Sequence, residues 1–190
     1  MAMGAKDRLI EIALKLFTER GYDAVGVQEI VEGAGVTKPT LYHHFGSKRG
    51  LLASVSASIW GDLMARLKEP LTYRGDLPLT LESVAAVILR FATERPRETQ
   101  LIITTLSAPL RSEAREVMRP AAARLHDDVS EVFVHAAAQH GNMRGRHEAY
   151  ARSFLGTVFT YVTLVLEGAE RASDELPHRI VHQFSHGIYS

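Results

Sequence analysis

The stretch Val27-Gln-Glu-Ile-Val-Glu-Gly-Ala-Gly-Val-Thr-Lys-Pro-Thr-Leu-Tyr-His-His-Phe45 contains two short helical segments joined by a three-residue turn. Gly35 opens the turn, and glycine readily adopts the left-handed conformation that ends a helix. Thr37 closes it, where a threonine hydroxyl group typically caps the next helix. Leu41 and Phe45 lie four residues apart, so they share the face that packs on other helices. This spacing predicts a helix-turn-helix over residues 27–45.

The opposite face of the second segment is polar. In a major groove such a helix presents Pro39, Thr40 and His43 to the base edges. Lys38 and Tyr42 lie on its flank, where the phosphates run. We therefore expect double-stranded DNA as the partner of this face.

Local charge supports this expectation. The whole chain has 22 basic and 22 acidic residues, so a patch, and not the total charge, must attract a polyanion. No acidic residue occurs from Gly33 to Gly61, whereas Lys48 and Arg49 open the following helix. Cations in a first turn are disfavoured by about 0.3–1 kcal/mol each, and a bound phosphate would reverse the sign.

Apolar residues recur at helical spacing along the rest of the 190-residue chain. We expect an all-α protein with a helix-turn-helix domain at residues 1–46 and a helical domain for effector binding and dimerisation at residues 47–190. A loop is expected at residues 72–78. Helices are expected at residues 6–20, 27–34, 38–45, 47–69, 79–94, 96–107, a longer segment up to 139 that is kinked or interrupted by Pro120, 146–170 and 176–188.

Composition excludes several classes of protein. The chain has no cysteine, which removes disulfides, thiolate zinc sites and cysteine nucleophiles, and suits a reducing cytoplasm. The longest uncharged apolar stretch, Ser153–Leu166, has 14 residues, and a membrane span needs ~20. The N-terminus lacks the apolar core of a signal peptide. We expect a cytoplasmic protein without membrane association.

Motifs for cofactors and catalysis are incomplete. Gly33 and Gly35 open a pattern typical of dinucleotide loops, but Lys38 occupies the third glycine position. His147 and Glu148 begin a zinc-protease pattern whose second histidine is missing. No G-x-S-x-G elbow occurs. We therefore predict no catalytic residue and no cofactor.

Three histidines at i, i+4 spacing, His178, His182 and His186, need separate consideration. Such spacing can hold a metal on one face of a helix. Helical projection places them away from the apolar side, so we interpret them as a solvated face and predict no metal. An adventitious metal site is the alternative.

The segment 146–170 is apolar nearly all round, so it must be covered on more than one side. Core packing and a dimer interface shared with residues 176–188 both satisfy this requirement, and Val158 and Phe184 belong to either. Several large side chains in the proposed effector domain, before and within the segment 146–170, are candidates for lining a ligand cavity. They are Trp60, Met64, Phe91, His126, Phe133 and Tyr161.

The N-terminal motifs resemble those of the TetR family of bacterial transcriptional regulators. The resemblance covers residues 6 to about 52 and rests on Gly21-Tyr22, Val27-Gln-Glu-Ile30, Ala34-Gly-Val-Thr37, Leu41-Tyr-His-His-Phe45 and Ser47-Lys48. It implies a homodimer, most consistent with a repressor, that reads a palindromic operator and has an effector cavity.

The resemblance also implies residue roles. Tyr42 and Lys48 would hold phosphates, and Thr37, Lys38, Thr40 and His43 would face bases or backbone. Four positions depart from the family pattern. Thr or Ser is frequent where this chain has Val25 and Gly26, Ala is usual at Val31, and an acidic or helix-favouring residue is usual at Gly50.

For regulation, a tilt of the helix at 47–69 would change the separation of the two recognition helices in a dimer. An apolar or amphipathic small molecule is the expected effector.

Two other classes of protein stay open. One is a helical enzyme or ligand-binding protein that does not act on DNA, and the other is an adaptor that binds protein through its N-terminal helices.

Overall fold

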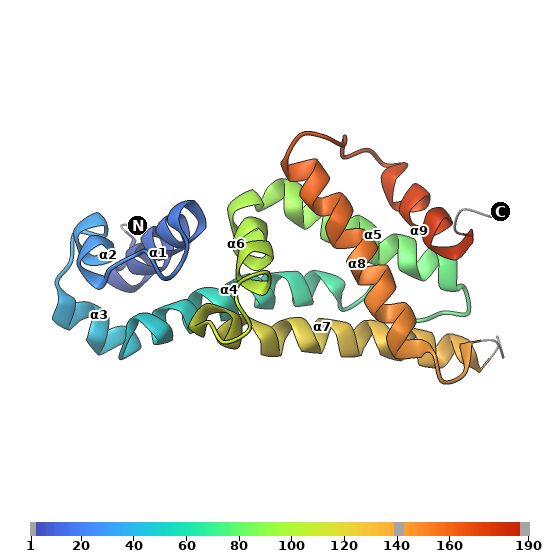
Figure 1. Cartoon of the computed structure of the whole chain (residues 1–190), viewed down its shortest axis with the longest axis horizontal. Helices are drawn as coiled ribbons and strands as arrows, with labels where there is room; N and C mark the ends of the chain where they lie inside the picture. The colour runs from blue at the N-terminus through green and yellow to red at the C-terminus, as the bar shows by residue number, and fades with distance from the viewer. Residues whose placement is uncertain (1–2, 139–142, 187–190) are drawn as a thin grey trace. The chain divides into compact units, whose positions relative to one another are not determined.

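The computed structural model describes residues 3–138 and 143–186, and all regular secondary structure in these ranges is helical (Figure 1). The predicted all-α class is confirmed. The predicted helix ends at 139 and 188 lie outside the described residues. In chain order the helices are α1 (Ala5–Arg20), α2 (Val27–Gly33), α3 (Lys38–Phe45), α4 (Lys48–Leu67), α5 (Leu77–Glu94), α6 (Pro96–Leu106), α7 (Glu113–Ala137), α8 (His147–Leu166) and α9 (Leu176–His186).

One helix start differs from the sequence-based expectation, and it lies beside a proline. Helix α5 begins at Leu77 and includes Pro78, because proline in a first turn loses no helical hydrogen bond. Asp76 caps this helix by accepting from the Leu79 N–H at 2.9 Å. Pro120 lies inside α7, which runs through it as one helix.

The helices form two compact units. The first contains the residues up to Gly61 together with Arg97–Pro120, and the second contains Asp62–Pro96 and the residues from Ala121 onward. Helices α4 and α7 contribute to both. This grouping by packing differs from the predicted division at residues 46 and 47, which concerns function and stays a prediction.

The core of the first unit lies where α1, α2 and α3 pack on one another (Figure 1). Leu9, Phe17, Ile30 and Leu41 are fully buried there. Burial of each such side chain contributes about 1.5–3 kcal/mol. These contacts fix the orientation of α3, whose apolar side is turned inward.

The second unit is built around contacts among α5, α8 and α9. The Phe184 ring lies 6.1 Å from that of Phe133 and 5.6 Å from that of Phe154, between centroids. Val158 is fully buried. Val158 therefore belongs to the core of this unit, and a charge there is expected to unfold it, whereas Phe184 is half-buried.

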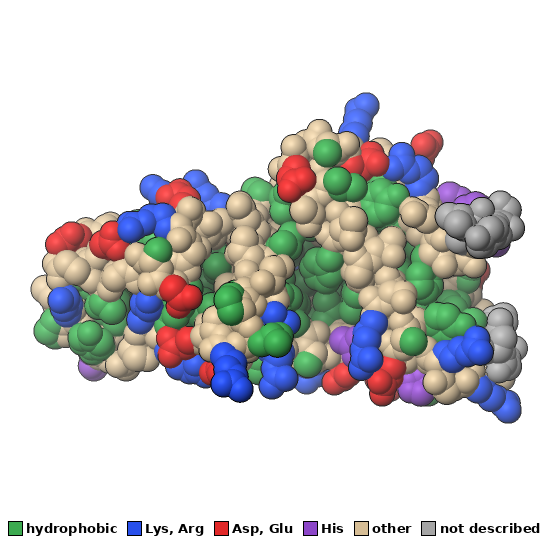
Figure 2. All heavy atoms as spheres, viewed as in Figure 1, with side chains coloured by type: hydrophobic (Ala, Val, Ile, Leu, Met, Phe, Trp, Pro, Cys, Tyr) green, Lys and Arg blue, Asp and Glu red, His purple; other side chains and the backbone are tan. Residues whose placement is uncertain are grey.

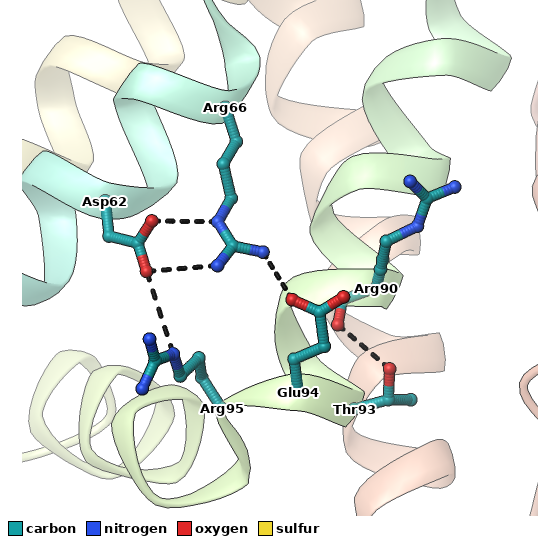
Figure 3. A network of polar contacts seen from close by, with 6 residues as sticks. All are labelled: Asp62, Arg66, Arg90, Thr93, Glu94 and Arg95. Carbon is teal, nitrogen blue, oxygen red and sulfur yellow. Dashed lines mark hydrogen bonds and ion pairs between the residues drawn. The ribbon is translucent and has the colours of Figure 1, made fainter.

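An ion-pair network joins the end of α4 to the end of α5 inside the second unit (Figure 3). The Arg66 guanidinium donates to Asp62 at 2.8 Å and to Glu94 at 2.6 Å. These bonds raise the pKa of Arg66, first through Asp62 and then through Glu94. Arg95 adds a contact of 3.7 Å to Asp62, and Arg66 lies 5.4 Å from the centre of the Phe91 ring.

Candidate nucleic-acid interface

The turn between α2 and α3 has the geometry that its glycine predicts. Gly35 has φ +61°, and the Val36 N–H donates to the Val31 carbonyl at 2.9 Å. Thr37 is the N-cap residue of α3, but its side chain caps no backbone N–H. Its hydroxyl group lies 3.0 Å from that of Thr40. The prediction that the Thr37 hydroxyl group caps a backbone N–H of α3 is therefore wrong, because this group pairs with the hydroxyl group of Thr40, one turn further along.

The polar side of α3 is open to solvent. Lys38, Pro39, Tyr42 and His43 are exposed, with 48% of Tyr42 accessible, and Thr40 is half-buried. Leu41, on the opposite side, is fully buried. The structure thus brings the predicted groove-facing and flanking residues to one free face of one helix.

The start of α2 compensates for the glycine at its N-cap. The Glu29 carboxylate accepts from the Gly26 N–H at 2.9 Å and from Arg20 at 2.5 Å. These bonds lower the pKa of Glu29, with the Gly26 bond as the larger cause. A hydroxyl residue at position 26 is therefore unnecessary for fixing this end of the helix.

The ammonium group of Lys48 is held by the chain itself. It donates to the carbonyl oxygens of Tyr22 and Val25, each at 3.0 Å, and lies 4.1 Å from the centre of the Tyr22 ring. An ammonium group has three N–H donors, so one is left for another acceptor. Lys48 first joins α4 to the loop before α2, and its role toward phosphate stays a prediction.

Arg49 faces two carboxylates of α7. Its Nη1 atom lies 3.3 Å from Glu116 and 3.6 Å from Glu113. The Tyr22 hydroxyl group donates to Glu113. Burial raises the pKa of Tyr22, and this hydrogen bond raises it further, so the phenol stays a donor. The stretch without acidic residues is therefore not free of acidic neighbours in space, which no local pattern in the sequence indicates.

Charged side chains of both signs are interspersed over the face of the molecule in Figure 2. This distribution agrees with the zero net charge of the chain.

Gly50 has a steric reason to be glycine. A Cβ atom built there would lie 2.0 Å from the Phe45 carbonyl oxygen, which is far inside contact distance. The last turn of α3 and the first turn of α4 approach each other too closely for any side chain. The departure from the family pattern at this position is therefore a packing requirement.

A pocket of about 520 Å³ lies in the second unit, which is large enough for a small molecule. Of the six predicted ligand residues only Phe133 lines it. Trp60 and Phe91 are buried in the core and Met64 is half-buried. His126 contacts the Glu148 carbonyl at 3.4 Å, and Tyr161 donates to Gln183. Among the residues that the structure describes, the lining is formed by Leu77, Pro78, Leu81, Phe133, Met143, Tyr150, Ser153, Phe184 and Ser185.

The three histidines of α9 are exposed, as helical projection predicts. Ring centroids of His182 and His186 are 4.6 Å apart, and His178 lies 2.8 Å from Glu82. Within residues 3–138 and 143–186, no three His, Asp or Glu side chains are grouped closely enough to hold a metal.

Comparison with known proteins identifies the helix-turn-helix. Residues 9–55 match the sequence model of the family described as bacterial regulatory proteins, tetR family. The chain is 35% identical over 81 residues to the HTH-type transcriptional repressor KstR2 of Rhodococcus jostii, across 43% of this chain and 40% of that protein. It is 38% identical over 66 residues to the transcriptional activator FasR of Mycolicibacterium smegmatis, across 35% and 30%. The chain thus matches less than half the length of either relative.

The fold extends the likeness to the whole chain. The Bacillus subtilis regulator FadR, solved in complex with stearoyl-CoA, superposes with a TM-score of 0.78 over 96% of this chain and 98% of that one, at 19% identity. The class of protein is thus an all-helical fold with an N-terminal helix-turn-helix. Residues 9–55 thus contain a helix-turn-helix domain of the tetR type, and the likeness of the rest of the chain is one of fold.

The two carbonyl bonds of Lys48 generate a prediction about stability. Lys48→Ala leaves two part-buried acceptors without their charged donor, and we expect the free energy of unfolding to fall by about 1–3 kcal/mol in urea denaturation. Lys38→Ala, on the exposed face, is the matched control and should change it by less than about 0.5 kcal/mol. Equal stability of both variants would contradict a stabilising role of the two Lys48–carbonyl hydrogen bonds.

Proposed function

We propose that the protein is a cytoplasmic, DNA-binding transcriptional regulator that reads a palindromic operator as a homodimer. The observation that supports this most is the solvent-exposed polar face of α3 on a rigid helix-turn-helix. Lys38, Tyr42 and His43 point away from a packed core that leaves them available to a groove. Phosphate contacts position such a helix, and contacts to base edges give the sequence preference.

We test this interface by selecting bound duplexes from a random pool with the full chain. Lys38→Ala, Thr40→Ala and His43→Ala should each change the selected bases, because one base contact is worth roughly 1–3 kcal/mol of discrimination. Tyr42→Phe should weaken binding to all sequences alike, since a phosphate contact reads no base. A wild-type protein that retains no duplex would refute the function, and unchanged sites in all three variants would refute the assignment of the face.

The Lys48→Ala variant adds a test of its phosphate contact. Loss of one phosphate contact lowers the log–log salt slope of binding by about 1. A loss of stability with an unchanged salt slope would show that Lys48 only stabilises the fold, through its bonds to Tyr22 and Val25, and contacts no phosphate.

A second copy of the chain is the proposed cover of α8. By length and composition α8 is the one described helix apolar enough to cross a membrane, yet only 28% of that window is buried inside the chain. Its outward side combines the half-buried Phe159 with the small residues Gly156 and Thr160. A single recognition helix of 8 residues reads only a few base pairs, so two copies are needed for specificity.

Gly156 gives a clean test of the dimer. A Cβ atom at Gly156 would meet no atom within 4 Å among the residues that the structure describes. We therefore expect Gly156→Glu to fold normally and to dissociate the dimer, with the light-scattering mass falling from twice 21.0 kDa to one copy. Ala123→Glu, on an exposed position of α7, is the control. A wild-type mass of one copy at micromolar concentration would contradict the dimer.

The pocket in the second unit is the proposed effector site. The described part of its lining has apolar and aromatic side chains, the hydroxyl groups of Tyr150, Ser153 and Ser185, and no charged residue. This chemistry suits an apolar or amphipathic small molecule whose polar atoms accept hydrogen bonds. The related fold of FadR holds stearoyl-CoA, so fatty acids and acyl thioesters are reasonable first probes. We propose that the protein acts as a repressor whose effector releases it from DNA.

Thermal-shift screening with such probes, followed by titration with and without operator DNA, tests the effector site. We expect operator DNA to weaken probe binding by about 5–150-fold, the usual range of coupling between two sites. Ser153→Trp should fill the pocket and remove binding, whereas Ser173→Trp, in an exposed loop, should not. A tight probe indifferent to DNA, or one retained by Ser153→Trp, would contradict this role.

A further inference from the structure

We infer that Glu113 and Glu116 hold Arg49 away from DNA phosphates and thereby set the affinity of the interface. The inference rests on the proposed function and adds a regulator of that same site. The sequence predicts a bound phosphate near Arg49 at the start of α4, but the Arg49 guanidinium contacts both carboxylates. A phosphate must replace these carboxylates before Arg49 contributes to binding.

The two ion pairs of Arg49 are exposed enough for a DNA phosphate to compete with the carboxylates. Arg49 is 45% exposed, Glu113 44% and Glu116 55%. Half-exposed pairs of this kind contribute about 0–1 kcal/mol each. Their distances of 3.3 and 3.6 Å are longer than those of tight charge-assisted hydrogen bonds. DNA therefore competes with contacts that are specific but weak.

The helix dipoles affect Arg49 and its two carboxylate partners differently. Arg49 lies in the first turn of α4, where a cation is disfavoured without an anionic partner. Glu113 and Glu116 lie in the first turn of α7, where anions are favoured without any cation. Arg49 thus needs a partner and the carboxylates do not. Without the carboxylates, a phosphate would be the partner left to Arg49, and α7 would lose little.

Tyr22 fixes one carboxylate and leaves the other free. Glu113 accepts from the Tyr22 hydroxyl group, so its position is set by the same residue that lies beneath the Lys48 ammonium group. The contact that the structure gives Glu116 is with Arg49. Glu116 is therefore the residue to change first, because its replacement leaves the Tyr22 bond intact.

The experiment measures binding of a random duplex and of the selected operator by the full chain over a range of salt. We expect Glu116→Gln to raise both affinities and Glu113→Gln/Glu116→Gln to raise them by about three- to tenfold, the equivalent of one to two such ion pairs. The log–log salt slope should steepen by about 0.9 as Arg49 neutralises a phosphate. Glu19→Gln, on exposed α1 surface, controls for the loss of one negative charge.

The same substitutions in an Arg49→Ala background separate release of Arg49 from general repulsion of DNA. The gain should disappear there, because no guanidinium remains to be released. A gain that persists without Arg49, or a gain equal to that of Glu19→Gln, would overturn the inference while leaving the proposed function intact. A wild-type chain that binds no duplex would refute the proposed function and the inference with it.

Discussion

The candidate interface depends on one ammonium group. Lys48 donates to the carbonyl oxygens of Tyr22 and Val25 and lies against the Tyr22 ring. Through these bonds the start of α4 is tied to the chain between α1 and α2. The position of α3, which ends three residues before Lys48, follows from that tie and from the burial of Leu41. Lys48, which the sequence predicts to contact phosphate, thus helps to fix the position of α3.

Local features of the fold could be predicted from the sequence because they depend on neighbouring residues. The left-handed turn at Gly35 and the inward side of Leu41 follow from chain conformation and helical period. The Thr37 cap and the start of α5 differ because hydroxyl partners and first-turn prolines admit more than one arrangement. The partners of Arg49 and the lining of the pocket come from helices far apart in the sequence, and no local spacing encodes them.

Tyr22 shows how one residue joins several contacts of the first unit. Its carbonyl oxygen and ring fix Lys48, and its hydroxyl group fixes Glu113, which contacts Arg49. The two cations at the start of α4 are therefore not independent charges on a surface. A change in the α7 end of this cluster reaches α4 through bonds within a single compact unit.

Gly50 has a consequence for how this protein tolerates change. The carbonyl oxygen of Phe45 occupies the space that any side chain at position 50 would need. A family average that places an acidic or helix-favouring residue there is therefore a poor guide to redesign of this chain. Such a residue would raise the intrinsic stability of α4 as an isolated peptide and still be incompatible with the junction to α3.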